Sequence, residues 1–195
     1  TESVRDGITV NLVYDGRAAR VTLDNAKVKE IEQYYDQCEA QGANEHQIEE
    51  SQKAVAQMEA IIGDPDRLCA VAKDFIHHYE TRVAEGAMVA GKAMFVCMNR
   101  NIAYDLYKII VEMRPQWSEK KISDDETALT DKEKKELKPI EKIKLVMTRS
   151  KDDEPALYEM LGTKDDRKEF DRQFKNPKSN FKIAIVVDMW LTGFD

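Results

Sequence analysis

The sequence lacks the features that mark membrane, secreted and disulfide-stabilised proteins. No run of about 18 apolar residues occurs, so we expect no membrane span. The opening residues 1–5 contain no apolar core of a signal peptide. The three cysteines, Cys38, Cys69 and Cys97, are odd in number and far apart. This spacing fits neither a disulfide framework nor a metal site, and predicts reduced, mostly buried thiols in a cytoplasmic protein.

The chain also lacks an excess of positive charge. Its formal net charge is −7, from 30 Lys and Arg against 37 Asp and Glu. This balance argues against a protein that holds nucleic acid by bulk attraction, but it leaves room for a few local phosphate contacts. With 195 residues and 42% apolar content, the chain can bury one core and a small appendage.

A true phosphate-binding loop is absent, although residues 86–92 imitate one. They match the first seven positions of the pattern G-x-x-x-x-G-K-[ST], but Ala93 replaces the hydroxyl residue that would hold magnesium. The loop also requires a strand before it and a helix after it, and we predict the reverse here. The apolar run 183–187 followed by Asp188 resembles a strand that ends in a magnesium-binding carboxylate. Without a phosphate loop, however, there is no bound nucleotide whose magnesium Asp188 could hold.

The first 62 residues are predicted to form a β-hairpin and a helical segment. Two β-branched runs, 8–14 and 18–23, flank Asp15-Gly16, the dipeptide that a tight hairpin turn favours. Residues 27–62 are polar with a weak apolar stripe, which indicates helices. A hairpin alone is marginally stable, so we expect it to pack on another part of the protein.

The remainder alternates between helices and apolar strands. Asp64 and Pro65 provide an N-cap and a first helical residue. The run Ile183 to Val187 is short, apolar and without polar alternation, as in a strand buried on both faces. The elements expected after the first helix are a strand at 92–98, a helix at 101–113 ended by Pro115, a charged surface insertion at 116–141 with a capping box at Thr130 to Glu133, a strand at 143–147, a helix at 165–174 and a strand at 183–187. This alternation predicts an α/β fold with a parallel sheet.

The octet Asp-Met-Trp-Leu-Thr-Gly-Phe-Asp at residues 188–195 resembles motif V of the motor subunit of type I restriction-modification enzymes, which are superfamily 2 DNA translocases. Residues 91–103 resemble motif IV of that family, and residues 6–17 resemble the segment that enters the second motor domain. The resemblance implies a RecA-like sheet of the P-loop NTPase type, flanked by helices and truncated at its end. Residues 63–195 would be that helicase C-terminal domain, preceded by a linker of residues 1–62.

The resemblance also implies a function for a longer parent protein. The parent would hydrolyse ATP with Mg²⁺, pull duplex DNA past itself and cut it, together with modification and specificity subunits. The chain contains no phosphate loop and no nuclease carboxylate cluster, and the family's arginine finger is expected after Asp195. An arginine finger contributes about 10³–10⁵ in rate, so we expect this fragment alone to be inactive, with no catalytic residue and no metal site of its own.

Site residues follow from the resemblance and from the strand ends. By position in motif V, Gly193 would approach the nucleotide through its backbone, Asp195 would contact the ribose or groups near the phosphates, and Thr192 would donate to a DNA phosphate. Ordinary loop capping is the alternative for Thr192 and Asp195. Parallel strands also bring residues that follow them to one edge, where hydroxyls and guanidinium groups can hold a DNA backbone without reading bases. These candidates are Asn99, Arg100, Thr148, Arg149 and Ser150.

Three alternatives stay open on the sequence. Arg149 can instead pair with Asp152 or Asp153 on the surface. The domain can belong to another superfamily 2 motor, such as a repair or remodelling translocase. It can also be a non-catalytic α/β interaction module whose contact surface is the insertion at 116–141. The resemblance favours the restriction enzyme.

Overall fold

A computed structural model of the chain describes residues 58–86 and 91–187. The predicted hairpin within residues 8–23 and most of the helical segment 27–62 lie outside the described residues. The motif V octet, with Thr192, Gly193 and Asp195, lies outside them as well. Residues 58–62 are helical, as predicted, and end at a turn at Gly63.

A parallel sheet forms the centre of the described structure. Its strands are β1 (Ala93–Val96), β2 (Ile143–Val146) and β3 (Ile183–Val186), in the order β1-β3-β2. The register aligns Ala93, Ile183 and Ile143 across the sheet. All four residues of β3 are buried, because this strand is central and covered on both faces. The predicted parallel α/β sheet is therefore confirmed.

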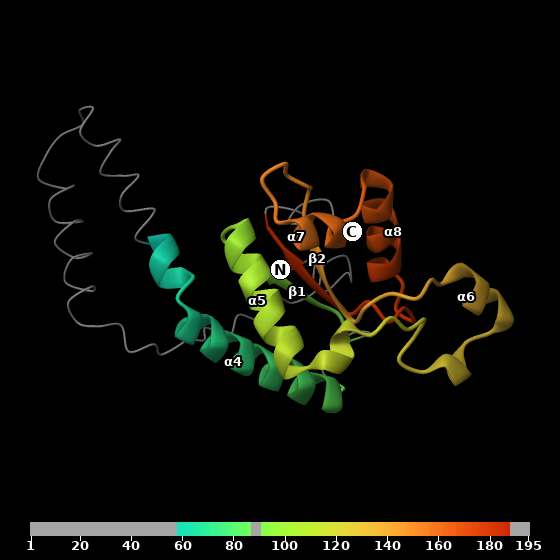
Figure 1. Cartoon of the computed structure of the whole chain (residues 1–195). Helices are drawn as coiled ribbons and strands as arrows, with labels where there is room; N and C mark the ends of the chain where they lie inside the picture. Colours follow the sequence, from blue (N-terminus) through green and yellow to red (C-terminus); the bar gives the residue numbers. More distant parts are fainter. Residues whose placement is uncertain (1–57, 87–90, 188–195) are drawn as a thin grey trace, which may run out of the picture.

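Helices cover the two faces of this sheet, so the fold has three layers (Figure 1). On one face, Ile183 and Ile185 pack in a core with residues of α4 (Pro65–Ala84) and α5 (Arg100–Met113). On the other face, Ala184 and Val186 pack with Phe174 of α8 (Lys164–Lys175). This strict alternation follows from the period of two along a strand.

Local capping signals set where these helices begin. The Asp64 carboxylate accepts a hydrogen bond from the Arg67 amide at 3.1 Å, which starts α4 as predicted. Asn99 caps α5 in the same way, and α5 stops before Pro115. A capping box of Thr163 and Asp166 starts α8, a signal that the sequence-based reasoning overlooked. It also missed the short α7 (Pro155–Met160) and the 3₁₀ turn η2 (Pro115–Ser118).

The charged insertion projects from the body and carries η3 (Glu126–Ala128) and α6 (Asp131–Glu136) (Figure 1). The predicted capping box is present at the start of α6. Most of the insertion is exposed, as predicted, but it also buries four apolar side chains, those of Trp117, Leu129, Leu137 and Ile140. Trp117 is 4% exposed and Ile140 is 5% exposed, because both pack into the two cores of the domain. An antiparallel bridge between Lys121 and Ile140 closes the base of the insertion.

The cysteines agree with the first expectations where the structure describes them. Cys97 is buried and Cys69 half-buried, and neither forms a disulfide, while Cys38 lies outside the described residues. Within residues 58–86 and 91–187, the helices are too short or too polar to cross a bilayer.

Candidate functional site

The carboxyl ends of the strands bring together those predicted DNA-contacting residues that the structure describes. Asn99 and Arg100 follow β1, and residues 148–150 follow β2. The chain leaves β3 between them, because β3 is the central strand. The Nη1 of Arg100 donates to the carbonyl of Thr148 at 2.7 Å, which joins the two segments directly. We call these residues, 99–100 and 148–150, the carboxyl edge.

Asn99 is the N-cap of α5 at this edge. Its Oδ1 accepts a hydrogen bond from the amide of Ile102 at 2.9 Å, which satisfies one free N–H group of the first turn of α5. The positive end of the α5 dipole therefore lies at the carboxyl edge.

Arg100 is held by a buried carboxylate from the segment after β2. Its Nη2 lies 2.6 Å from both carboxylate oxygens of Asp153, and its Nε lies 3.1 Å from one of them. The Asp153 side chain is 5% exposed and also accepts from the Ser150 amide at 2.6 Å. Burial raises the pKa of Asp153, but the bonds from Arg100 and Ser150 outweigh burial and lower this pKa overall. We call Arg100 and Asp153 the clamp, because they tie the segments after β1 and β2 together.

Arg149 is arranged differently from Arg100. Its guanidinium carbon lies 4.4 Å from the centre of the Tyr158 ring, a cation–π contact with a side chain of α7 that is 41% exposed. Its Nε is buried and has no hydrogen-bond partner. No hydrogen bond or ion pair joins Arg149 to Asp152 or Asp153 in the described structure, where the Asp153 carboxylate binds Arg100 instead. Sequence reasoning missed Tyr158, since nothing in its spacing links it to Arg149.

The two hydroxyl residues of the edge complete the arrangement. Thr148 is exposed, and its carbonyl accepts a hydrogen bond from Arg100. The Oγ of Ser150 accepts from the Asp152 amide at 3.4 Å. The carboxyl edge thus presents one guanidinium group stacked on an aromatic ring, beside an exposed threonine and the amino end of a helix. Such a group can donate two parallel hydrogen bonds to a phosphate.

The imitation of a phosphate loop at residues 86–92 is not one, as predicted. α4 ends at Ala84 before it, and β1 begins at Ala93 after it, so a helix precedes and a strand follows. The Nζ of Lys92 donates to the carbonyl of Phe181, beside the first residues of the strands and away from the carboxyl edge. The described residues therefore do not fit a nucleotide by this route. Nor do three or more His, Cys, Asp or Glu side chains gather in a metal-binding group within them.

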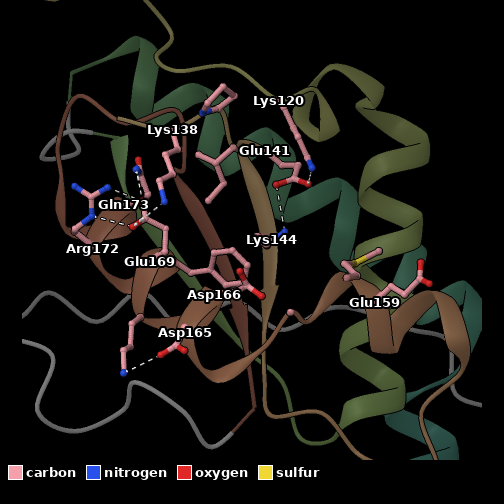
Figure 2. Close-up of a pocket in the computed structure, with 16 residues that line it drawn as sticks. Lys120, Lys138, Glu141, Lys144, Glu159, Asp165, Asp166, Glu169, Arg172 and Gln173 are labelled. Atoms are coloured by element: carbon pink, nitrogen blue, oxygen red, sulfur yellow. Dashed lines mark hydrogen bonds and ion pairs between the residues drawn. The ribbon is translucent and has the colours of Figure 1, made fainter. Parts of the chain in front are cut away.

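A groove of about 670 Å³ lies between the base of the insertion and α8 (Figure 2). Its charged side chains largely neutralise one another. Lys144 lies 3.2 Å from Glu141, and Arg172 lies 2.6 Å from Glu169. Because both signs line the groove and pair within it, we assign it no part in binding phosphates.

Two curated proteins match the chain along its length. The chain is 31% identical over 198 residues to the type I restriction enzyme HindI endonuclease subunit of Haemophilus influenzae, an alignment that covers 100% of the chain. It is 32% identical over 193 residues to a candidate type I restriction enzyme MjaIXP endonuclease subunit of Methanocaldococcus jannaschii, covering 98% of the chain. The chain spans 16% of the length of each relative.

No family model matches the chain, and no solved structure matches it. The two relatives carry the same description, which is the one that the motif V octet had suggested. The resemblance is confirmed at that level: this chain is a relative, over its whole length, of one segment of the endonuclease subunits of type I restriction enzymes.

Proposed function

We propose that the chain is the second RecA-like motor domain, residues 63–195, of a type I restriction endonuclease subunit, with residues 1–62 as the linker that leads into it. The observation that carries this proposal is the full-length match to segments of two such subunits. The parallel order β1-β3-β2, with helices on both faces, is compatible with a RecA-like domain. The parent would hydrolyse ATP, translocate duplex DNA and cut it.

In this proposal the carboxyl edge contacts the DNA backbone. Arg149 supplies the phosphate-binding guanidinium group, since it lies over Tyr158 and forms no ion pair with a described residue, although it acts electrostatically on Asp166. Thr148 and Ser150 add hydroxyl groups beside it. Arg100 and Asn99 shape the edge instead, because their side chains are already engaged by Asp153 and by the amide of Ile102. Contacts of this kind position a duplex without reading its sequence, as a translocase requires.

The nucleotide contacts are proposed from motif V. Gly193 and Asp195 would face ATP in the cleft between two motor domains, and Thr192 would donate to DNA. The chain leaves β3 at the same edge as the arginines, which is compatible with a loop that serves both ligands. The phosphate loop and the Mg²⁺ ligands would belong to the first motor domain, so the fragment alone would turn over no ATP.

Partners follow from the same proposal. A type I endonuclease subunit would act in the cytoplasm, on duplex DNA, with modification and specificity subunits. Another superfamily 2 translocase would share the fold but not these partners. The full-length matches to restriction subunits favour the first choice.

Substitution of Asp195 in a complete endonuclease subunit tests the nucleotide role. We expect Asp195→Ala to lower DNA-stimulated ATP hydrolysis, while binding of the specificity and modification subunits is retained. Unchanged turnover would remove Asp195 from the nucleotide site. ATP hydrolysis by the isolated 195-residue chain would contradict the half-site arrangement.

A further inference from the structure

Three lysines line up at the amino ends of the three strands, at the edge opposite the carboxyl edge. Lys92 immediately precedes β1, Lys142 precedes β2 and Lys182 precedes β3. Since those first residues are in register, the lysines are neighbours across the sheet. The Ala93 amide donates to the Lys182 carbonyl, and the Lys182 amide donates to the Lys142 carbonyl, both at 2.9 Å. We call these residues the amino-edge lysines.

Their side chains are partly withdrawn from water. Lys182 is 8% exposed, and its Nζ donates to the Pro177 carbonyl at 2.7 Å. The Lys92 ammonium lies 5.2 Å from the centre of the Phe174 ring and donates to the Phe181 carbonyl. Removing a charged ammonium group from water is costly unless an opposite charge accompanies it.

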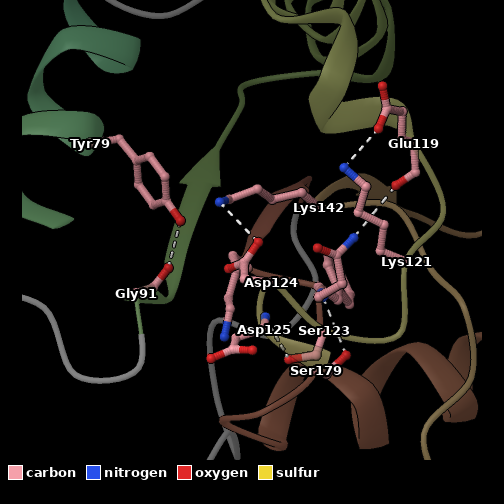
Figure 3. A network of polar contacts seen from close by, with 12 residues as sticks. Tyr79, Gly91, Glu119, Lys121, Ser123, Asp124, Asp125, Lys142 and Ser179 are labelled. Carbon is pink, nitrogen blue, oxygen red and sulfur yellow. Dashed lines mark hydrogen bonds and ion pairs between the residues drawn. The ribbon is translucent and has the colours of Figure 1, made fainter. Parts of the chain in front are cut away.

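Only one carboxylate among the described residues directly offsets this charge. The Oδ1 of Asp124, which belongs to the insertion, lies 3.3 Å from the Nζ of Lys142 (Figure 3). The same carboxylate also acts electrostatically on Lys92 and Lys182. Glu80 faces Lys142 as well, but it is bound through both oxygens by Arg114.

Two of these lysines, Lys92 and Lys182, are disfavoured in their charged forms. Burial, and to a smaller extent the neighbouring Lys182, lower the pKa of Lys92 to about 7, although Asp124 acts in the opposite direction. Burial also lowers the pKa of Lys182, with a contribution from Lys142. Three cations thus share one anion, which leaves a local excess of positive charge in a chain whose net charge is −7.

We propose that the amino-edge lysines bind an oxyanion of the phosphate class, at the position where the carboxylate of Asp124 now serves as an internal substitute. The ligand would reach the cluster from solvent beside Lys142, because the side chain of Lys142 is 22% exposed and that of Asp124 is 49% exposed. A phosphate group carries more negative charge than a carboxylate and has more acceptor oxygens, so it neutralises the cluster better. The site lies across the sheet from the carboxyl edge and does not depend on the proposed motor function.

Pyrophosphate binding to the intact 195-residue chain tests this site. We titrate pyrophosphate by calorimetry at pH 6.5, with sodium chloride holding the ionic strength constant. Lys142→Gln should weaken binding about tenfold, since it removes a charge-assisted hydrogen bond. Asp124→Asn should tighten binding about threefold to tenfold, since it removes a competing anion. Lys168→Gln, an exposed lysine paired with Asp165 on α8, is the matched control and should change nothing.

A second measurement needs no variant and guards against misfolding. The Nζ nuclear magnetic resonance signals of Lys92 and Lys182 should shift with pyrophosphate in the unmodified chain. Competition by a short DNA duplex would identify the ligand as a nucleic-acid phosphate, and its absence would identify a small free phosphate. No binding above the chloride control, or equal binding by Lys142→Gln, would overturn the proposal.

Discussion

The guanidinium group of Arg100 and the carboxylate of Asp153 form a two-pronged ion pair between residues 53 positions apart, with Nη2 at 2.6 Å from both oxygens. The pair joins the segments that follow β1 and β2, on either side of central β3. It also separates the two arginines of the carboxyl edge by role. Arg100 fixes the shape of the edge, whereas Arg149 is the proposed contact to phosphate.

Breaking the clamp should destabilise the domain. Asp153→Asn removes the charge that binds Arg100, and we expect a loss of about 2 kcal/mol in the free energy of unfolding, the scale of hydrogen bonds to charged groups. The pKa of Asp153 is lowered in the folded chain. The stabilisation is therefore present above the unfolded pKa of about 3.9 and is lost as the pH falls through the lower folded pKa. Urea unfolding at pH 7 and pH 3 measures both effects, and a similar loss from Lys168→Gln would count against the clamp.

Removing the charge of Arg149 should weaken DNA binding without unfolding the domain. In a complete endonuclease subunit, we expect Arg149→Gln to reduce affinity equally for unrelated duplexes. The negative slope of log K against log salt should become shallower by about 0.9, the value for one phosphate contact. Binding is measured by fluorescence anisotropy over a salt series. A loss restricted to particular sequences would contradict contact with the backbone.

Tyr158 should support Arg149 through its ring alone. Tyr158→Ala removes the surface on which the guanidinium lies and should weaken DNA binding in the same direction as Arg149→Gln, by about 0.5–1 kcal/mol. Tyr158→Phe keeps the ring and serves as the matched control, so its affinity should equal that of the unmodified protein. If both variants bind as the unmodified protein does, the stacking has no part in binding.

The buried charge of Lys92 should give stability a recognisable dependence on pH. Its pKa is about 7 in the folded chain and about 10.4 when unfolded, so the unfolded chain binds more protons between these values. Stability should therefore rise with pH in this window, by up to about 1.4 kcal/mol per unit for this group. Lys182, whose pKa is also lowered, adds to the same trend. Urea unfolding from pH 6 to 9 should show a smaller slope in Lys92→Met than in Lys168→Met, and equal slopes would refute the assignment.

Shortening the insertion distinguishes the motor from an interaction module. Removal of residues 116–141 would take Trp117 and Ile140 out of the cores, and Leu129 and Leu137 are also buried. The deletion is therefore confined to residues 130–136, replaced by a glycine-serine linker. On the proposed function, translocation by the complete subunit should largely survive this change. Loss of partner binding with an intact fold, judged by circular dichroism, would favour the module.

The sequence predicted the described elements well because their signals are local. Asp64 and Pro65 mark a helix start through bonds within one turn. The apolar run of β3 shows burial on both faces without knowledge of its neighbours. The capping box of α6 was found by the same logic. Such features depend on residues a few positions apart, which a single chain displays directly.

The contacts that define the two sheet edges were not predictable in this way. Asp153 was considered as a partner of Arg149, but tertiary structure brings it to Arg100. The lysine alignment requires both the order β1-β3-β2 and the strand register, neither of which composition or periodicity contains. Trp117 and Ile140 lie in a segment rich in charge, so the average polarity concealed two core residues.

The bridge between Lys121 and Ile140 has a practical consequence for observing this protein at work. It joins the two ends of the projecting segment to each other, so that α6 lies beyond a hydrogen-bonded neck. A cysteine introduced at the exposed Lys132 would carry a dye far from both cores. Paired with a second dye on a neighbouring domain, it would test whether the proposed motor opens and closes during turnover.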